Sequence, residues 1–223
     1  MAPQSDSRHP AASGAGPAAG PGEPPPPGPV PLVLVHGLWD TPRLFRRLEE
    51  QLAGRRDPLL IPHLPHGLGS RPLLELAAQL GTAVEQRFGP SQPVDLLGFS
   101  MGGVIGRSWL QLLGGHRRVR RFISVGSPQR GSWVAWPWPR RWLASIADLR
   151  PGSPLLQRLN ADLSPLHGID CCSFWCLPDH MVVPSWRGVL PLGRCQRLPV
   201  WNHSHLITRP AALDPIVAEL LRP

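Results

Sequence analysis

The residues most able to do chemistry lie in the short sequence Gly98-Phe99-Ser100-Met101-Gly102. A serine hydroxyl can attack an acyl carbonyl when a sharp turn exposes it and a neighbouring base removes its proton. The pattern of a serine between two glycines is short and also arises by chance. Here the apolar segment PVDLLGF precedes the serine and the segment MGGVIG follows it, which favours a strand, a tight turn and a helix around a nucleophile.

A nucleophilic serine needs a base, and the base needs an acid that orients it. Asp179 follows the segment CCSFWCL, and His203 and His205 follow the segment RCQRLPV. If both segments are parallel strands, the three residues lie at their carboxyl ends, where sites of such sheets form. Asp170 precedes its strand and would lie at the opposite edge. We therefore predict that Asp179 is the acid, in preference to Asp170 or Asp162.

Segments of two kinds alternate along the chain and would position these residues. Continuous apolar runs predict buried strands, and leucines spaced three or four apart predict helices. Strands are expected at 31–37, 57–65, 93–99, 120–127, 169–177 and 194–200, and helices at 41–55, 71–88, 101–113 and 211–221. This alternation predicts an α/β fold with a mostly parallel sheet of about six strands, covered by helices on both faces.

The composition changes near residue 30. Residues 1–30 are mainly Ala, Gly, Ser and Pro, which predicts a disordered tail, and residues 31–223 are long enough for one domain. Residues 128–165 form an insertion rich in Trp and Pro, which we expect to be a short cap. We find no signal peptide and no apolar run long enough to span a membrane, so we expect a cytoplasmic protein without a transmembrane segment.

The chain is strongly basic, with a formal net charge of +8, and all 23 of its basic residues are arginine. The densest run, HRRVRR at 116–121, is interpreted as a solvated helix end that leads into a strand. No nucleic-acid-binding motif accompanies it, so we expect no nucleic-acid partner. The charge is compatible with acidic substrates or anionic membrane surfaces. The four cysteines, Cys171, Cys172, Cys176 and Cys195, lack zinc-site spacing and are expected to be buried thiols.

Several segments together resemble the α/β-hydrolase superfamily, in particular the small bacterial lipases and esterases of the minimal type. LVLVHGLWDT resembles the strand and His-Gly turn that form an oxyanion hole, and DLLGFSMGGVIGR resembles the nucleophile turn. FISVGSPQRGS, DHMVVP and HSHLIT resemble the later strand, the acid loop and the histidine loop. Gln129 stands where many members have a histidine, and we assign it no catalytic role.

The resemblance also implies roles for individual residues. In the family, two apolar residues follow the catalytic histidine after a gap of two, and His203 fits this spacing, whereas His205 departs from it by two positions. We therefore favour His203 as the base and keep His205 as the alternative. The backbone amides of Leu38 and Met101 are expected to form the oxyanion hole. His36 is expected to be structural.

The expected activity is hydrolysis of carboxylic esters by a lipase or esterase through Ser100, Asp179 and His203, without a metal or cofactor. A thioesterase or acyltransferase on the same fold is an alternative, and so is a non-catalytic binding protein. The expected partner is an acyl-ester or lipid substrate, with transient contact with a lipid surface. Four tryptophans of the insertion, Trp133, Trp136, Trp138 and Trp142, either pack on the sheet edge or form an apolar cap over the site.

Overall fold

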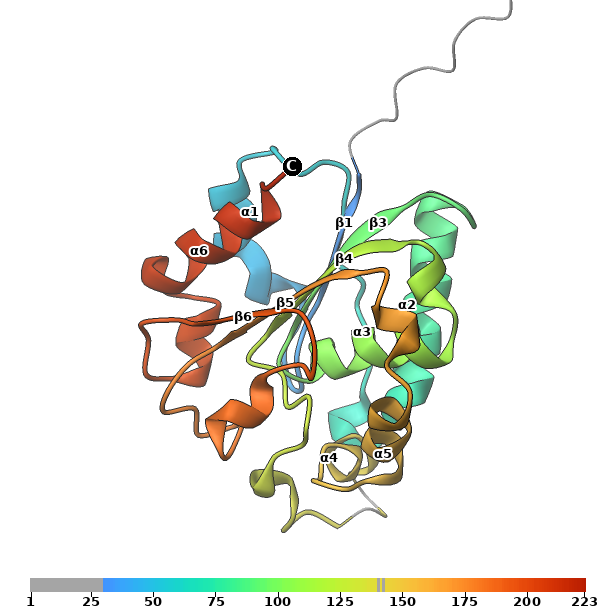
Figure 1. Cartoon of the computed structure of the whole chain (residues 1–223), viewed down its shortest axis with the longest axis vertical. Coiled ribbons are helices and arrows are strands. Elements are labelled where there is room, and N and C mark those ends of the chain that lie inside the picture. Colours follow the sequence, from blue (N-terminus) through green and yellow to red (C-terminus); the bar gives the residue numbers. More distant parts are fainter. Residues whose placement is uncertain (1–29, 140, 142) are drawn as a thin grey trace, which may run out of the picture.

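The computed structural model describes residues 30–139, 141 and 143–223, and it contains one six-stranded sheet (Figure 1). The strands lie in the order β2-β1-β3-β4-β5-β6, and every neighbouring pair is parallel. Their bounds are β1 Leu32–Val35, β2 Leu59–Leu60, β3 Val94–Phe99, β4 Val119–Val125, β5 Asp170–Trp175 and β6 Arg194–Arg197. The predicted fold class is confirmed. The predicted disordered tail, apart from Val30, lies outside the described residues.

Helices cover both faces of the sheet. On one face lie α1 (Arg46–Leu52) and α6 (Pro210–Leu220), and on the other lie α2 (Leu73–Phe88) and α3 (Met101–Leu112) (Figure 1). Side chains alternate between the two faces along each strand. Leu32 and Leu34 of β1 therefore pack into the core under α1 and α6, while Val33 and Val35 pack into the core under α2 and α3. All four residues are fully buried, which explains the continuous apolar run in the sequence.

The insertion at 128–165 contains two helices that the sequence analysis did not predict. These are α4 (Ala144–Asp148) and α5 (Pro154–Ala161). Helix α5 begins with a capping arrangement, because the Ser153 hydroxyl accepts a hydrogen bond from the Leu156 N–H and Pro154 occupies the first turn. In the described residues of the preceding segment, which is rich in tryptophan and proline, one short 3-10 turn forms at Trp133–Ala135. The predicted helix at 41–55 also divides, into a 3-10 turn at Pro42–Phe45 and α1.

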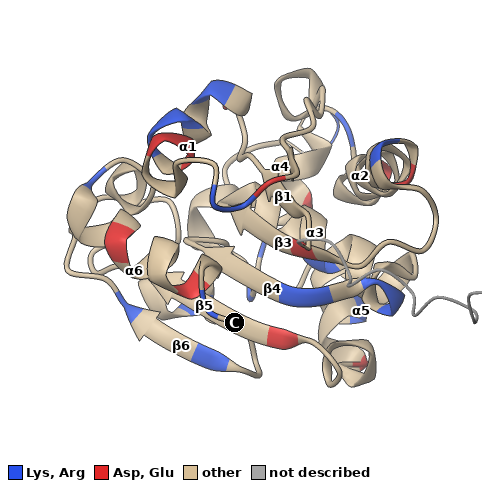
Figure 2. Ribbon diagram, turned by 90° about the horizontal axis from the view of Figure 1, so that it is seen from above, with Lys and Arg blue, Asp and Glu red and all other residues tan. Residues whose placement is uncertain are grey.

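Charged residues gather at the amino edge of the sheet, where β3, β4, β5 and β6 begin (Figure 2). Asp95 is fully buried there and accepts hydrogen bonds from Arg56 at 2.8 Å and from Arg120 at 2.9 and 3.1 Å. Arg121 is buried and donates to the backbone carbonyls of Glu219, Arg222 and Pro223 near the chain end. The interpretation of 116–121 as a solvated run is therefore wrong for Arg121, whereas Arg120 is exposed while it pairs with Asp95.

Asp95 joins the start of β3 to the segment before β2 and to β4, so we predict that Asp95→Asn lowers stability. The substitution removes the negative charge that pairs with Arg56. Breaking such a buried ion pair lowers the free energy of unfolding by roughly 3 kcal/mol. Burial alone would raise the pKa of Asp95, but hydrogen bonds from Arg120 and Arg56 lower it overall. The stabilisation is therefore complete above the unfolded-state pKa of about 4 and is lost as pH falls through the lower folded-state pKa.

Urea unfolding at pH 7 and at pH 3 measures this difference. Asp214→Asn, at an exposed position on α6, is the matched control and should change the free energy of unfolding little. An Asp95→Asn protein as stable as the control at pH 7 would show that the network contributes nothing to folding.

Candidate functional site

Ser100 occupies a strained turn between β3 and α3. Its backbone angles are φ 54° and ψ −127°, and a positive φ is rare for a residue with a side chain. Two backbone hydrogen bonds hold the turn, from the Ser100 N–H to the Val125 carbonyl at 2.9 Å and from the Gly103 N–H to the Ser100 carbonyl at 3.1 Å. The turn therefore fixes Ser100 at the carboxyl edge of the sheet, at the N-terminus of α3.

The glycines beside Ser100 allow three pieces of backbone to approach closely. A Cβ atom on Gly98 would lie 2.4 Å from the Gly103 Cα, and one on Gly102 would lie 2.1 Å from the Val35 carbonyl oxygen. Real Cβ atoms do not approach other atoms so closely, so only glycine fits at these two positions. This agrees with the sequence prediction for Gly98 and Gly102. Gly103 is equally constrained, by the Ser127 hydroxyl, and the sequence analysis did not single it out.

Asp179 and His203 form a buried pair at the same edge of the sheet. The Nδ1 atom of His203 lies 2.8 Å from Oδ2 of Asp179, and the backbone amides of Met181 and Val182 donate to Oδ1 of Asp179 at 2.9 and 3.0 Å. Because Asp179 accepts a hydrogen bond from Nδ1–H of His203, the other ring nitrogen, Nε2, carries no hydrogen and can accept a proton. Nε2 is buried and has no hydrogen-bond partner within the described residues. The His203 ring packs 5.0 Å from the ring of Phe99, the neighbour of Ser100.

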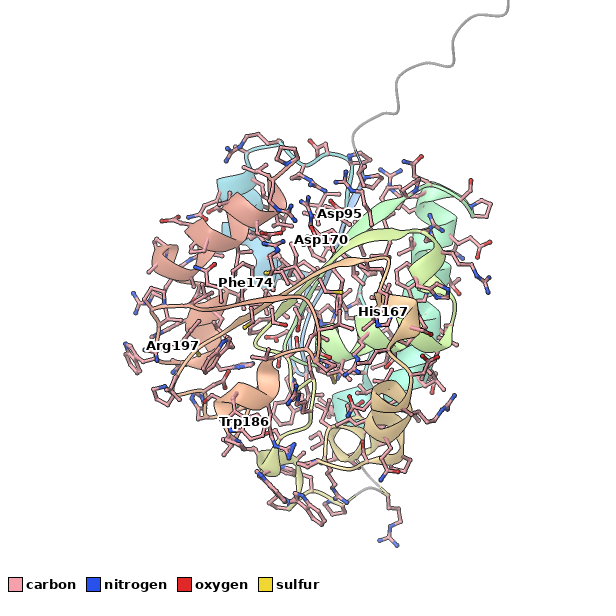
Figure 3. The ribbon with its side chains drawn as sticks, viewed as in Figure 1. Asp95, His167, Asp170, Phe174, Trp186 and Arg197 are labelled. Atoms are coloured by element: carbon pink, nitrogen blue, oxygen red, sulfur yellow. The ribbon has the colours of Figure 1, made fainter. Side chains whose placement is uncertain are left out.

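The rival candidates lie elsewhere. His205 is half-buried on the same 3-10 turn (His203–Leu206), and its ring packs edge-on against Trp201. Asp170 lies at the opposite edge of the sheet, near Asp95, where it pairs with Arg194 and Arg222 (Figure 3). Asp162 follows α5 and accepts a hydrogen bond from the Ser164 N–H. The structure thus brings Asp179 together with His203 and separates the other candidate acids from both.

Contacts of the His36 ring fix the turn that is expected to supply the oxyanion hole. The buried His36 ring accepts a hydrogen bond from the Leu64 N–H at Nε2 and contacts the Gly37 carbonyl through Nδ1 at 3.0 Å. Burial lowers the pKa of His36, so the ring stays neutral and can keep both contacts at neutral pH. Beyond this turn, the Trp39 N–H donates to Nε2 of His66. These contacts fix the backbone on either side of Leu38, in agreement with a structural role for His36.

A pocket of about 240 Å³ opens beside Ser100, and its lining is mostly apolar. The residues of the expected oxyanion hole, Leu38 and Met101, form part of its wall. The insertion supplies much of the remainder through Val134, Trp138, Ile146 and other residues of 128–149. Trp136, in contrast, stacks on Trp133 at the surface, and Trp142 lies outside the described residues. One insertion therefore contributes both to the pocket wall and to an exposed aromatic surface.

Further exposed tryptophans lie outside the insertion, namely Trp39, Trp186 and Trp201. Trp186 lies at the end of the molecule opposite Asp95 and Asp170 (Figure 3). Indole rings are common at boundaries between water and lipid, because they combine an apolar face with one polar N–H. No helix of the described residues is long and apolar enough to cross a membrane.

Two carboxyl-edge residues were not predicted from the sequence. A Cβ atom added to Gly37 would lie 2.8 Å from Oδ2 of Asp40 and 3.0 Å from Cβ of Ser100, so both side chains lie close to Gly37. Partial burial raises the pKa of Asp40, while the nearby His203 and His66 oppose this rise. Cys176 lies with Sγ 3.9 Å from Oδ2 of Asp179, and burial raises its pKa to about 12, so it remains a neutral thiol. The position of Asp40 directly after the His-Gly turn was the available signal.

The remaining cysteines and Gln129 have structural surroundings. Cys171 and Cys172 are buried as predicted, but Cys195 is exposed, like every residue of the edge strand β6. The prediction of a buried thiol is therefore wrong for Cys195. Gln129 is fully buried and donates from Nε2 to the Ser124 hydroxyl. Within the described part of the chain, no three His, Cys, Asp or Glu side chains are grouped as metal ligands would be.

A family model described as the alpha/beta hydrolase fold matches residues 30–158. The chain belongs to the α/β-hydrolase fold family. The matched range includes the His-Gly turn, the Ser100 turn and the first part of the insertion. The later Asp179 and His203 loops lie beyond it.

Relatives of this α/β hydrolase include enzymes of two kinds. Lysosomal thioesterase PPT2 from Bos taurus is 31% identical over 74% of this chain, which spans 60% of that protein's length. Among solved structures, the lipase BlEst2 from Bacillus licheniformis matches with a TM-score of 0.67 at 19% identity. The match covers 91% of this chain and 96% of the lipase chain. RedJ, a thioesterase of Streptomyces coelicolor, matches with a TM-score of 0.57 at 22% identity. The match covers 92% of this chain and 90% of the RedJ chain. Both solved structures share their fold with this chain.

The buried contact between His203 and Asp179 predicts unequal effects of replacing the two neighbouring histidines. We expect His203→Ala to lower turnover by several orders of magnitude, because the members of a triad act as a unit. His205→Ala should change turnover only a few-fold, since its ring contacts Trp201 at the outer side of the turn. Steady-state rates on one activated ester measure both. The reverse order of effects would identify His205 as the base.

Proposed function

We propose that this α/β hydrolase cleaves acyl esters, as a lipase or esterase does, through Ser100, His203 and Asp179. The observation that carries the proposal is the buried Asp179–His203 contact of 2.8 Å at the carboxyl edge of the sheet that also carries the strained Ser100 turn. A histidine held at Nδ1 by a carboxylate, with a free Nε2, has the form of a general base for a serine. The apolar pocket beside Ser100 supplies the place for an acyl chain.

In the proposed reaction, Ser100 Oγ attacks the acyl carbonyl while His203 Nε2 accepts the hydroxyl proton. Asp179 keeps the proton at Nδ1 and stabilises the imidazolium that forms. The backbone amides of Leu38 and Met101 donate to the negatively charged oxygen of the tetrahedral intermediate. His203 then gives its proton to the leaving atom, and an acyl-enzyme remains. A water molecule, activated by the same histidine, releases the acid and restores Ser100.

The pocket favours one chain-like acyl group over a bulky substrate. Its volume of about 240 Å³ lies below the range of roughly 300–1,000 Å³ that drug-sized ligands occupy. Two exposed tryptophans of its lining, Trp39 and Trp138, fit the transient lipid contact expected from the sequence. The cytoplasmic location remains a prediction from the sequence.

Hydrolysis of acyl thioesters is the second candidate. The relative from Bos taurus is named a thioesterase, and its 31% identity is the specific observation in favour. The same residues serve both reactions, because only the leaving atom differs, an alcohol oxygen in one and a thiol sulfur in the other. Rates on an ester and a thioester with the same acyl chain distinguish them.

A fluorophosphonate probe tests the nucleophile, because it reacts covalently with an activated serine. We expect the probe to label the intact protein and to fail on Ser100→Ala, with turnover lowered on the order of 10⁴-fold or more. Ser91→Ala, at an exposed position before β3, is the matched control and should keep its label. Labelling that survives in Ser100→Ala would contradict the assignment, and an unlabelled wild type would favour a non-catalytic binding protein.

The pocket lining predicts how selectivity for chain length depends on the tryptophans. Trp138→Ala should lower kcat/KM on long-chain esters about tenfold or more and change it little on acetate esters, because the ring lines the pocket. Trp136→Ala is the matched control, since that ring stacks on Trp133 outside the pocket. Equal losses on short and long chains, together with a lower Tm, would mean that Trp138 serves packing alone.

A further inference from the structure

A second and larger concavity, an open groove of about 830 Å³, lies along the outer side of the 3-10 turn that carries His203. Four arginines line it, Arg43, Arg46, Arg47 and Arg209, and all four are exposed. Ser204 and His205, the two residues that follow His203, also line it. No aspartate or glutamate is among its lining residues, so the groove presents positive charge and hydrogen-bond donors to a ligand.

The arginines of this groove are not neutralised by strong ion pairs. Arg47 donates to the backbone carbonyl of Thr208 at 2.6 Å, which uses a neutral acceptor and leaves its charge in place. Arg46 pairs with Glu50 at 3.5 Å, but both side chains are exposed, and such pairs contribute little. Arg43 and Arg209 pair with no carboxylate within the described residues. Figure 2 shows the basic and acidic residues of α1 on its ribbon.

The groove and the apolar pocket lie on opposite faces of the sheet. Leu44 in the groove packs against the core under α1 and α6, whereas Met101 and Ile146 in the pocket belong to the core under α2 and α3. Ser100 directly follows the central strand β3, and it lines the apolar pocket but not the groove. A substrate bound at Ser100 therefore has the apolar pocket in one direction and, across the sheet, the face of the arginine groove in the other.

The chemistry of the reaction assigns the two directions. The acyl chain is apolar and belongs in the apolar pocket. The leaving group must lie next to His203, because His203 gives it a proton. Since Ser204 and His205 continue from His203 into the groove, the groove lies on the side of the leaving group.

We propose that the arginine groove binds phosphate groups carried by the leaving-group part of the substrate. Arginine forms paired hydrogen bonds with phosphate oxygens, and several guanidinium groups in one groove suit a leaving group with more than one phosphate. This inference rests on the proposed function, which it deepens by naming the chemistry of the leaving group. The shared chemistry is phosphate on the leaving group, carried either by a thiol such as coenzyme A or by a lipid headgroup.

The test compares two substrates with the same acyl chain and the same thioester bond, one an acyl-coenzyme A and the other an uncharged N-acetylcysteamine thioester. The groove variant is Arg43→Gln with Arg209→Gln, two arginines whose removal breaks no ion pair of the described residues. The matched control is Arg87→Gln with Arg158→Gln, which removes the same charge at exposed positions of α2 and α5. We expect the groove variant to raise KM for the acyl-coenzyme A about tenfold and to leave kcat, and both constants for the neutral thioester, unchanged.

A binding measurement separates this proposal from the proposed hydrolysis. Coenzyme A should bind the intact chain carrying Ser100→Ala, and the affinity should fall about tenfold with the groove substitutions and with rising salt. If the protein hydrolyses neither these thioesters nor the matching acyl ester but coenzyme A still binds through the groove, the groove proposal stands and the activity proposal fails. Equal KM changes on both substrates, or equal changes in groove and control variants, would overturn the groove proposal for coenzyme A.

A vesicle experiment distinguishes the lipid source of the same phosphate chemistry. Vesicles of phosphatidylcholine alone and vesicles containing phosphatidylglycerol are compared for binding of the wild type and the groove variant. Groove-dependent hydrolysis of phospholipid in the vesicles, with KM raised in the groove variant, would support a phosphorylated lipid leaving group. Groove-dependent binding to anionic vesicles, with no change in KM for any phosphorylated substrate, would overturn the proposal and make the groove a membrane contact.

Discussion

The site depends first on how closely the backbone of α3 approaches β1 and β3. Gly98, Gly102 and Gly103 lie where a Cβ atom would meet backbone or a buried hydroxyl at 2.0–2.4 Å. This close approach leaves only Ser100 to connect strand and helix, and it forces the positive φ of that residue. A turn of this kind costs on the order of 1–3 kcal/mol, so the surrounding sheet must stabilise it. The parallel register of β3 with β1 and β4 supplies that stability, and it also brings the His-Gly turn and the Asp179 and His203 loops to the same edge.

The two edges of the sheet are chemically different, and the difference follows from the parallel topology. At the amino edge, Asp95 is fully paired with Arg56 and Arg120, and the guanidinium of Arg121 binds carbonyls near the chain end. At the carboxyl edge, Nε2 of His203 is left without a partner among the described residues, the pocket opens beside Ser100, and the groove includes the two residues that follow His203. Buried polar groups are normally satisfied. The paired charges of the amino edge therefore stabilise the fold, and the unpartnered Nε2 of His203 at the carboxyl edge is available to a substrate.

Much of this arrangement could be predicted from the sequence because it depends on short-range patterns. Apolar runs identified the six strands, and the order of Ser100, Asp179 and His203 along those strands singled out the residues that the fold brings to one edge. Properties that depend on distant segments were less accessible. Arg121 looked like a solvated residue because the carbonyls that bury and bind it lie about 100 residues away along the chain. Cys195 looked buried because nothing local reveals that β6 is an edge strand with one open side.

The tryptophans of the insertion show why a local pattern can predict the place of a segment without assigning its side chains. Their position after β4 places the insertion at the carboxyl edge, which is a property of topology. Which ring enters the pocket is a property of packing, and Trp138 does so while Trp136 stacks on Trp133. The same distinction applies to α1, whose apolar side was evident from its leucines, whereas its arginines come to line a groove only through the approach of the His203 turn. The pocket beside Ser100 is thus apolar and the groove beside the His203 turn is cationic, and the proposed substrate, with an apolar acyl chain and an anionic leaving group, would match both.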